Sequence, residues 1–277
     1  MLPQNLFEAE KLTDTITRIR MPGSVFSYIV KGTDRAAVID TGWGIGAFRQ
    51  YVEVFLDGMP YDLILTHGHF DHAGGAAEFD KVWLNNRDIF LAGDIAQEER
   101  RFAAMKDLYP QATLEELVPT KVDGYTDLPY GTVFDLGGEK LEIVCLGGHT
   151  PGSVGILFQN ARILLAGDAC CSFTLLYPEL GGCTVREYLE NLEQTWSRYR
   201  DSFDTVLYSH PHNYGGPEVF PQMIALCREI LEGKDDHIPH CDMGHIRAYT
   251  AKALDDSGRR ADGKIANLSY TLEELPE

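Results

Sequence analysis

Short apolar runs separated by glycine and proline turns make up the first part of the chain. Alternation of apolar and polar residues over 15–20 predicts a strand, and the continuous apolar runs at 24–30, 36–40 and 63–65 predict further strands. Apolar residues recur at helical spacing over 47–56, which predicts a helix after the glycine-rich turn that follows residue 40.

The second half of the chain shows the same kind of pattern. Densely spaced apolar runs predict strands at 81–84, 132–136, 140–146, 154–158, 162–166 and 205–208, with a further strand at 266–270. Two helices are predicted at 184–203 and 220–231. The first has one apolar stripe, which is expected to pack into a core: Val185, Tyr188, Leu189, Leu192 and Trp196.

Two segments lie outside this series of strands. Residues at about 86–120 are rich in helix formers and predict a helical insertion, which either covers the mouth of a site or exposes a solvated face. A C-terminal extension is expected from about residue 235. We expect the whole chain, 1–277, to form a single domain, because a large α/β domain can reach this length undivided.

Candidate chemistry is concentrated where the strand at 63–65 ends. The sequence His67-Gly-His69-Phe-Asp71-His72 follows directly. In an extended chain, side chains two positions apart point the same way, so His67, His69 and Asp71 can converge on one point. We expect Asp71 to cap a short helix over 73–77. Imidazole and carboxylate groups at this density favour a divalent metal such as zinc over a solvated polar loop.

Three later apolar runs also end in residues of metal-binding type. They lead to His149, Asp168 and His210, respectively. Ligands that repeatedly follow strands can meet at one edge of a layered sheet. Together with the first cluster, they make five histidines and two aspartates, the number needed for two adjacent metals that share one carboxylate.

These motifs resemble those of the metallo-β-lactamase superfamily. The matching segments follow the family order over roughly residues 15–215: Val38-Ile-Asp-Thr-Gly42, His67-Gly-His69-Phe-Asp71-His72, Gly148-His149-Thr-Pro-Gly-Ser153, Gly167-Asp168 and Ser209-His210. The chain is similar to the glyoxalase II and lactonase-like members. The exported β-lactamases of the superfamily lack this complete ligand set, so antibiotic hydrolysis is not expected.

The resemblance implies an α/β fold, a four-layer αββα sandwich with the metals at the sheet edges. It implies two divalent ions, zinc first, with iron or manganese as alternatives. It assigns the ligands by position: His67, His69 and His149 to the first metal, Asp71, His72 and His210 to the second, with Asp168 bridging both.

The expected activity is zinc-dependent hydrolysis of a small ester, lactone or thioester by a hydroxide that bridges the two metals. Asp71 is expected to orient that nucleophile and to carry its proton. Three alternatives stay open: a sulfur dioxygenase with one iron, a phosphodiesterase of the same fold, and a non-catalytic scaffold.

The sequence also assigns roles to residues around the candidate ligands. Substrate contacts are assigned to Phe70, Tyr177, His212 and Tyr214. Asp40 either reaches the metal site or, as we favour, holds the turn after it. Cys170 and Cys171 are expected to be buried rather than to bind metal. The stretch His237-Ile-Pro-His240-Cys241-Asp-Met-Gly-His245 is interpreted as a polar surface loop, in preference to a substrate-binding loop or a second zinc site.

Charge and composition narrow the partners. The formal net charge is −18, which disfavours a nucleic-acid substrate and leaves a small molecule as the expected one. The first ten residues do not resemble a signal peptide, no apolar run is long enough to span a membrane, and the six cysteines are scattered. We therefore expect a cytoplasmic protein without a membrane partner. A homodimer formed through the C-terminal helices is an open possibility.

Overall fold

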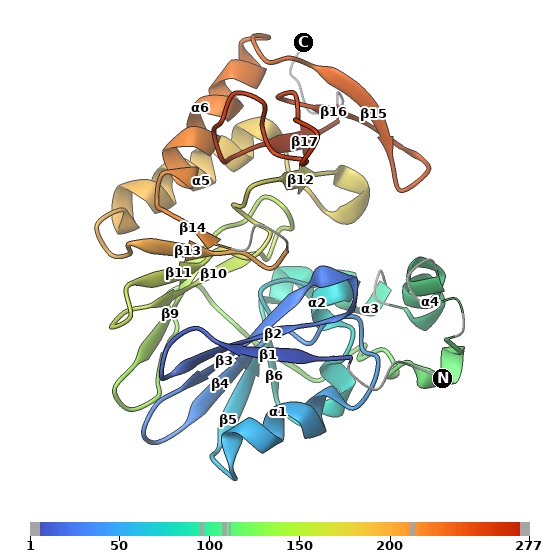
Figure 1. Cartoon of the computed structure of the whole chain (residues 1–277), viewed down its shortest axis with the longest axis vertical. Coiled ribbons are helices and arrows are strands. Elements are labelled where there is room, and N and C mark those ends of the chain that lie inside the picture. Colours follow the sequence, from blue (N-terminus) through green and yellow to red (C-terminus); the bar gives the residue numbers. More distant parts are fainter. Residues whose placement is uncertain (1–5, 95–96, 107–109, 111, 211–213, 272–277) are drawn as a thin grey trace. The chain divides into compact units, whose positions relative to one another are not determined.

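The computed structural model describes residues 6–94, 97–106, 110, 112–210 and 214–271. The chain divides into two compact units, which are described separately. Unit 1 comprises Met1–Ile143 and Ser209–Pro211, and unit 2 comprises Val144–Tyr208 and His212–Glu277. Both contain sheets and helices, so the predicted α/β class is confirmed (Figure 1). The single domain over residues 1–277, with its insertion and extension, stays a prediction.

Unit 1 is built on a seven-stranded sheet whose strands follow one another in sequence order. The strands are β1 (Glu8–Lys11), β2 (Ile16–Arg20), β3 (Phe26–Lys31), β4 (Ala36–Ile39), β5 (Tyr61–Ile64), β6 (Val82–Leu84) and β7 (Tyr125–Asp127). Strands β1 to β4 pair antiparallel, whereas β4 to β7 are parallel. A parallel pair brings the carboxyl ends of its strands to the same edge of the sheet.

Helix α1 (Phe48–Leu56) covers part of this sheet. It buries Phe48, Val52 and Leu56 against strand residues such as Val38 and Leu63, which are 0% and 1% exposed. The helical spacing of these three apolar residues explains why the segment folds as a helix. The prediction of a helix at 47–56 is confirmed.

The predicted insertion contains helices α3 (Ile89–Asp94) and α4 (Glu98–Lys106). Short 3-10 turns lie at Asn86–Asp88 (η3) and Leu114–Glu116 (η4). Helix α4 buries Arg101 and Met105, which are four residues apart and therefore share one face. The insertion thus has a buried face as well as a solvated one.

The remaining elements of unit 1 are short. They are η1 (Pro22–Ser24), α2 (Phe70–Ala73), η2 (Ala76–Glu78), β8 (Val133–Asp135) and most of β9 (Lys140–Cys145). Strands β8 and β9 form a hairpin that pairs Val133 with Glu142.

Unit 2 contains two layers of strands and two long helices. Strands β10 (Val154–Phe158), β11 (Ile163–Leu165), β13 (Thr205–Leu207) and β14 (Tyr214–Gly215) pair in the order β14-β13-β11-β10. Helices α5 (Val185–Tyr199) and α6 (Val219–Leu231) run side by side (Figure 1). Trp196 of α5 stacks on Phe220 of α6 with ring centroids 5.8 Å apart. The predicted apolar stripe of α5 does pack into a core.

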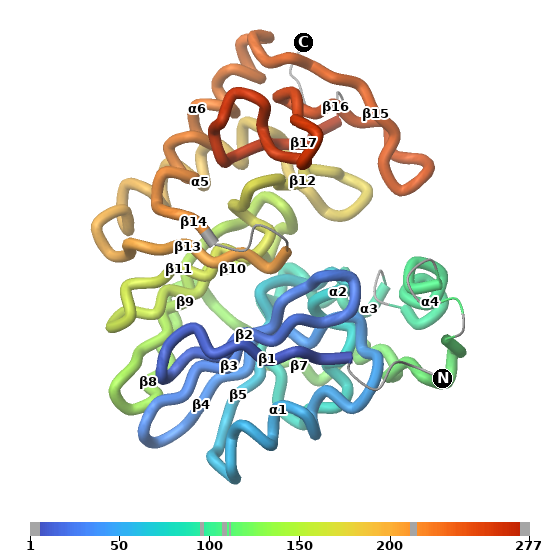
Figure 2. The backbone as a smooth tube through the Cα atoms, in the orientation of Figure 1, coloured from blue at the N-terminus to red at the C-terminus, as the bar shows by residue number. Residues whose placement is uncertain are grey.

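A four-stranded sheet completes unit 2 in the order β12-β17-β16-β15. Its strands are β12 (Thr174–Leu176), β15 (Ile238–Asp242), β16 (Ile246–Thr250) and β17 (Leu268–Tyr270), and η5 (Pro178–Leu180) follows β12. The interpretation of 237–245 as a polar surface loop is right about exposure and wrong about the backbone, because β15 and β16 form a hairpin at the surface (Figure 2). His240 and Cys241 alternate between the two faces of β15, an alternation that the histidine-rich composition concealed.

Among the described residues, no helix combines the length and the apolar character that crossing a bilayer requires.

Candidate metal centre

The ends of β4 and β5 place the first side chains of the site. In the parallel register, Val38 lies beside Leu63 and Ile39 beside Ile64, so Asp40 comes next to the residues that follow β5. The two carboxylate oxygens of Asp40 accept hydrogen bonds from the backbone N–H and the hydroxyl of Thr66, both at 2.8 Å. Asp40 is 1% exposed and has a φ of 62°, a conformation that non-glycine residues rarely adopt. This strained turn is held by the carboxylate itself.

Thr66 determines which nitrogen of His67 carries the proton. The hydroxyl of Thr66 donates its single hydrogen to Asp40, so it accepts from Nδ1 of His67 at 3.0 Å. Nε2 of His67 therefore carries the lone pair. A ligating histidine in proteins usually has its other nitrogen held by an acceptor in this way.

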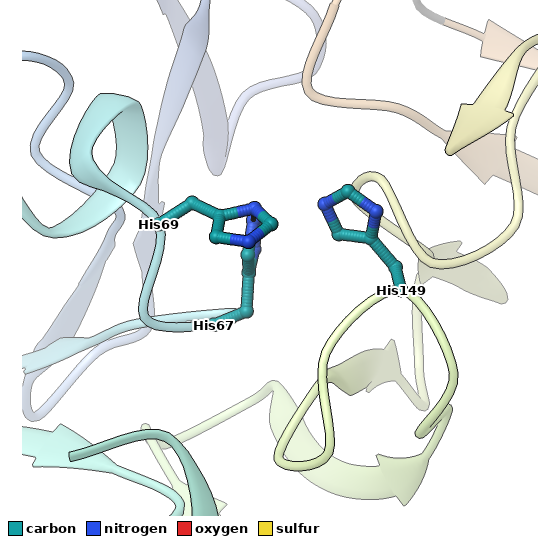
Figure 3. A group of neighbouring side chains, drawn as sticks. All are labelled: His67, His69 and His149. Atoms are coloured by element: carbon teal, nitrogen blue, oxygen red, sulfur yellow. Dashed lines mark hydrogen bonds between the residues drawn. The ribbon is translucent and has the colours of Figure 1, made fainter. Parts of the chain in front are cut away.

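His67 and His69 present their rings from one loop, as Figure 3 shows; the figure also draws His149, which belongs to unit 2. Nε2 of His67 and Nδ1 of His69 are 3.1 Å apart. Two ligand nitrogens on one tetrahedral zinc ion are separated by about 3.3 Å, given a zinc–nitrogen distance of about 2.05 Å. The donor types and their spacing therefore fit a divalent metal ion.

A second group in unit 1 consists of Asp71, His72 and His210. Their candidate ligand atoms all lie within 4.8 Å of one another. Oδ2 of Asp71 is 3.6 Å from Nε2 of His72 and 3.4 Å from Nε2 of His210. The backbone carbonyl of Ser209, just before His210, accepts the N–H of Phe26 in β3, so this segment is tied to the sheet of unit 1.

Two local expectations about this segment are wrong. Helix α2 begins at Phe70 and its N-cap is His69, with no side-chain cap, so Asp71 lies inside the first turn and does not cap a helix over 73–77. For the same reason Asp71 does not continue the alternation of His67 and His69, since alternation ends where the chain turns helical. Asp71 instead groups with His72 and His210.

Asp40 reaches the candidate ligands, so the preference for a purely structural turn residue is also wrong. Its Oδ2 accepts a hydrogen bond from Nδ1 of His72 at 2.9 Å. His72 is fully buried, and the carboxylate orients its ring with Nε2 as the ligand atom. The negative charge also makes the imidazole a stronger base and hence a better ligand.

In unit 2, His149 lies on the loop after β9. Nδ1 of His149 donates to the backbone carbonyl of Leu175 at 2.8 Å, so Nε2 is again the ligand atom. The loop packs closely on α5, because Gly148 lies against the ring of Tyr188 and has a φ of 155°. A side chain at Gly148 would overlap this ring, which explains the glycine.

Asp168 follows β11 in the same unit. Its Oδ2 lies 3.9 Å from Nε2 of His149. The neighbouring Cys170 and Cys171 are buried, as predicted. Burial raises the pKa of the Cys171 thiol to about 12, and the Asp168 carboxylate adds to the effect. A thiol with this pKa stays protonated at neutral pH.

The predicted substrate contacts have diverse surroundings. Phe70 packs against Trp43, with ring centroids 4.9 Å apart. Tyr177 is 1% exposed, and its hydroxyl contacts Asp242 at 2.9 Å and Ser269 at 2.6 Å. His212 and the side chain of Tyr214 lie outside the described residues. A role in substrate binding stays a prediction for all four.

Two buried charged residues of the insertion escape the sequence pattern, Asp88 and Arg101, both 0% exposed. Each contacts the backbone beside the candidate ligands of unit 1. For Arg101 one signal was available: it is four residues from Met105 and therefore shares a face with an apolar residue. No comparable signal exists for Asp88.

Known proteins share this sequence pattern. The chain is 24% identical to the bovine acyl-coenzyme A thioesterase MBLAC2 over 227 residues, which cover 70% of this chain and 75% of that protein. It is 30% identical to the hydroxyacylglutathione hydrolase GloC of Haemophilus influenzae over 139 residues, 48% of this chain and 60% of that protein.

A solved structure is similar in fold. The metallo-β-lactamase from Pontibacter korlensis aligns with a TM-score of 0.58 at 19% identity, covering 80% of this chain and 99% of that one. The predicted metallo-β-lactamase fold is thereby confirmed. The family model for the metallo-beta-lactamase superfamily matches residues 20–188, which include all the candidate ligands except His210. The chain therefore belongs to the metallo-beta-lactamase superfamily.

Proposed function

We propose that this protein is a metal-dependent thioesterase with a dinuclear centre, zinc being the expected metal. The observation that carries the proposal is the way in which three rings are held. In His67, His72 and His149 an oxygen acceptor binds Nδ1 and leaves Nε2 as the ligand atom. Such an arrangement is typical of metal-binding histidines and is unnecessary in a polar loop.

The proposed centre has seven ligands, which are assigned from the sequence motifs. His67 and His69 with His149 would hold one ion, and Asp71, His72 and His210 the other, with Asp168 bridging the pair. Membership of the superfamily and the order of the motifs along the chain support this assignment. The grouping of Asp71, His72 and His210 supports the second half of it independently.

Bound divalent ions would supply Lewis acidity and a water of lowered pKa. The residues of this chain do the rest. Asp71, whose side chain is 17% exposed, holds the attacking water and accepts its proton on the carboxylate oxygen that is not a ligand atom. The ligand atom would be Oδ2, which lies 3.4 Å from Nε2 of His210. Water adds to the thioester carbonyl, and the carbon–sulfur bond breaks to release a carboxylic acid and a thiol. Asp71 is then placed to return the proton to the departing sulfur.

The choice of thioesters among the predicted esters, lactones and thioesters comes from the relatives. An acyl-coenzyme A thioesterase and a hydroxyacylglutathione hydrolase are among them, and the substrates named for both are thioesters. The strongly acidic chain continues to favour a small molecule over a nucleic acid. Homodimerisation and a cytoplasmic location stay predictions.

Purified, zinc-loaded protein should release free thiol from acyl-coenzyme A and S-acylglutathione substrates. The expected kcat/KM for the better thioester is at least about tenfold above that for lactones and oxygen esters, which corresponds to about 1.4 kcal/mol. Asp71→Asn, which keeps the shape of the side chain, should abolish thiol release. Activity on phosphodiesters alone would overturn the proposal, and one iron per chain with oxygen consumption would favour the dioxygenase.

A further inference from the structure

The insertion of unit 1 buries two opposite charges close to the candidate ligands. Asp88 ends η3 and Arg101 lies in α4, and both side chains are fully buried. A charged group in a protein interior is costly unless polar partners compensate it. Burial lowers the pKa of Arg101, yet a guanidinium stays charged at neutral pH. The contacts of both residues are therefore energetically important.

Asp88 acts on the loop between the two histidines. Its Oδ2 accepts the backbone N–H of Gly68 at 2.9 Å, and Gly68 separates His67 from His69. The contact is tight, because a Cβ at Gly68 would lie 2.6 Å from the carbonyl oxygen of Asp88. Asp88 thus restrains the backbone of Gly68. The residues on either side of it, His67 and His69, carry candidate ligand nitrogens that are 3.1 Å apart.

Arg101 acts on the other end of the ligand segment. Its Nη1 donates to the carbonyl oxygens of Trp43 at 2.8 Å and of Gly74 at 3.0 Å. Gly74 directly follows α2, the helix that contains Asp71 and His72. The fit is close on this side too, since a Cβ at Gly44 would lie 2.5 Å from Nη1 of Arg101.

One of these two carbonyl oxygens belongs to Trp43, a residue whose side chain also contacts α2. Trp43 packs on Phe70, the first residue of α2. Arg101 therefore joins the turn after β4 to the end of α2 by two hydrogen bonds from Nη1, while its Nη2 donates to the carbonyl oxygen of Val118. The single nitrogen of a lysine side chain cannot reproduce this arrangement of two donor nitrogens.

We propose that Asp88 and Arg101 are positioning residues with separate tasks: Asp88 places His67 and His69, and Arg101 places Asp71 and His72. The inference rests on the proposed dinuclear centre for its consequences in metal binding. Neither residue is a ligand. The insertion would then be an integral part of the centre, since its two buried charges hold the ligand segment at both ends.

The test compares Arg101→Met and Asp88→Leu, each of which removes the hydrogen-bonding group, with Arg100→Met, which replaces an exposed arginine one residue away on α4. Stepwise metal affinities of the full chain are measured by competition with a chromophoric chelator. We expect Arg101→Met and Asp88→Leu each to weaken the affinity for one of the two metals by about 10- to 100-fold, the usual effect of removing a group that orients ligands. Arg100→Met should bind both metals as the wild type does.

Nitrogen-15 spectra of the histidine rings in metal-free protein separate the two tasks. With resonances assigned from His67→Ala and His72→Ala, Arg101→Met should shift the resonances of His72 and leave those of His67 in place. Asp88→Leu should shift those of His67 and leave those of His72 in place. Folded variants with unchanged His spectra and wild-type metal affinity would overturn the inference, as would equal effects of both variants on every ring.

These outcomes are distinguishable from failure of the proposed function. If the wild type binds two metals and cleaves thioesters while the variants match it, only the positioning roles fail. If the wild type binds no metal, the proposed function fails and the metal-binding part of the inference fails with it. In that case the His spectra still decide whether Asp88 and Arg101 position different rings.

Discussion

His72 in unit 1 and His149 in unit 2 are held through the same ring nitrogen by different acceptors. Nδ1 of His72 donates to the carboxylate of Asp40, whereas Nδ1 of His149 donates to the backbone carbonyl of Leu175. Both acceptors select the same tautomer, but only the carboxylate adds a negative charge. A backbone carbonyl is therefore enough to orient a histidine ring, whereas making the ring a stronger base needs a charged side chain.

The same contrast extends to the interiors of the two units. Near its candidate ligands, unit 1 buries full charges, including Asp40, Asp88 and Arg101. The core of unit 2 buries weak acids such as Tyr188 and Cys227, and burial raises the pKa of both so that they stay neutral. Unit 1 thus places buried ionisable side chains beside its candidate ligands, whereas the two long helices of unit 2 pack around weak acids that stay neutral.

The largest effect is expected when one candidate ligand is removed from each unit in turn. His67→Ala and His149→Ala should each reduce thioesterase activity by more than about 100-fold, the upper end of the range for losing a group that only orients a ligand. Activity and metal content per chain are measured for both. A fully active His149→Ala would show that His149 is not a ligand.

Thiol labelling gives this prediction a readout that does not need substrate. All six cysteines lie beyond residue 143, in unit 2. Metal at about 100 times its Kd stabilises the folded protein by about 2.7 kcal/mol. Because a buried cysteine is labelled only when the protein opens, labelling should slow by about 100-fold. His149→Ala should remove this protection. Equal protection in both proteins would contradict the ligand role of His149.

Asp40→Asn sharpens the comparison, because it removes the charge from the acceptor of His72 while keeping its shape. We expect metal affinity and activity to fall by about 10- to 100-fold. Asp62→Asn is the matched control: Asp62 is also a buried aspartate on the same sheet, but it pairs with Arg35 and Trp83. That variant should lose stability without selective loss of metal. Wild-type affinity in Asp40→Asn would show that orientation alone suffices.

The smallest expected effect concerns pH and unit 2. Burial raises the pKa of Cys227 in the folded protein, whereas the unfolded chain loses this proton above the ordinary thiol pKa of about 8.5. The resulting contribution to the free energy of unfolding is fully present below that pH and is lost as the pH rises above it. One such group adds a slope of about 1.4 kcal/mol per pH unit to the free energy of unfolding. Urea unfolding between pH 9 and 10.5 should therefore show a shallower loss in Cys227→Ala.

The control for the alkaline experiment is Cys241→Ala, which removes an exposed thiol of the β15–β16 hairpin. It should keep the wild-type slope. Identical slopes of the free energy of unfolding against pH in all three proteins would mean that burial of Cys227 does not contribute to the loss of stability at alkaline pH.

Much of the site could be predicted from the chain because its clues are local. His67, His69, Asp71 and His72 lie within six residues of one another, directly after an apolar run that forms β5. The hairpin at 238–250 could not be predicted in this way. Its residues alternate weakly, and its pairing with β17 depends on a segment about 20 residues further along the chain.

The sequence by itself determined the kind of chemistry and the elements that present it, since ligand types, their spacing and the strand periodicity are properties of neighbouring residues. Only the tertiary structure decided how the ligands are held. Asp40 reaches His72 across 32 positions, and Arg101 reaches Gly74 across 27. Such contacts depend on strand register and helix packing, and therefore on the burial of apolar surface throughout a unit, which no short stretch of sequence records.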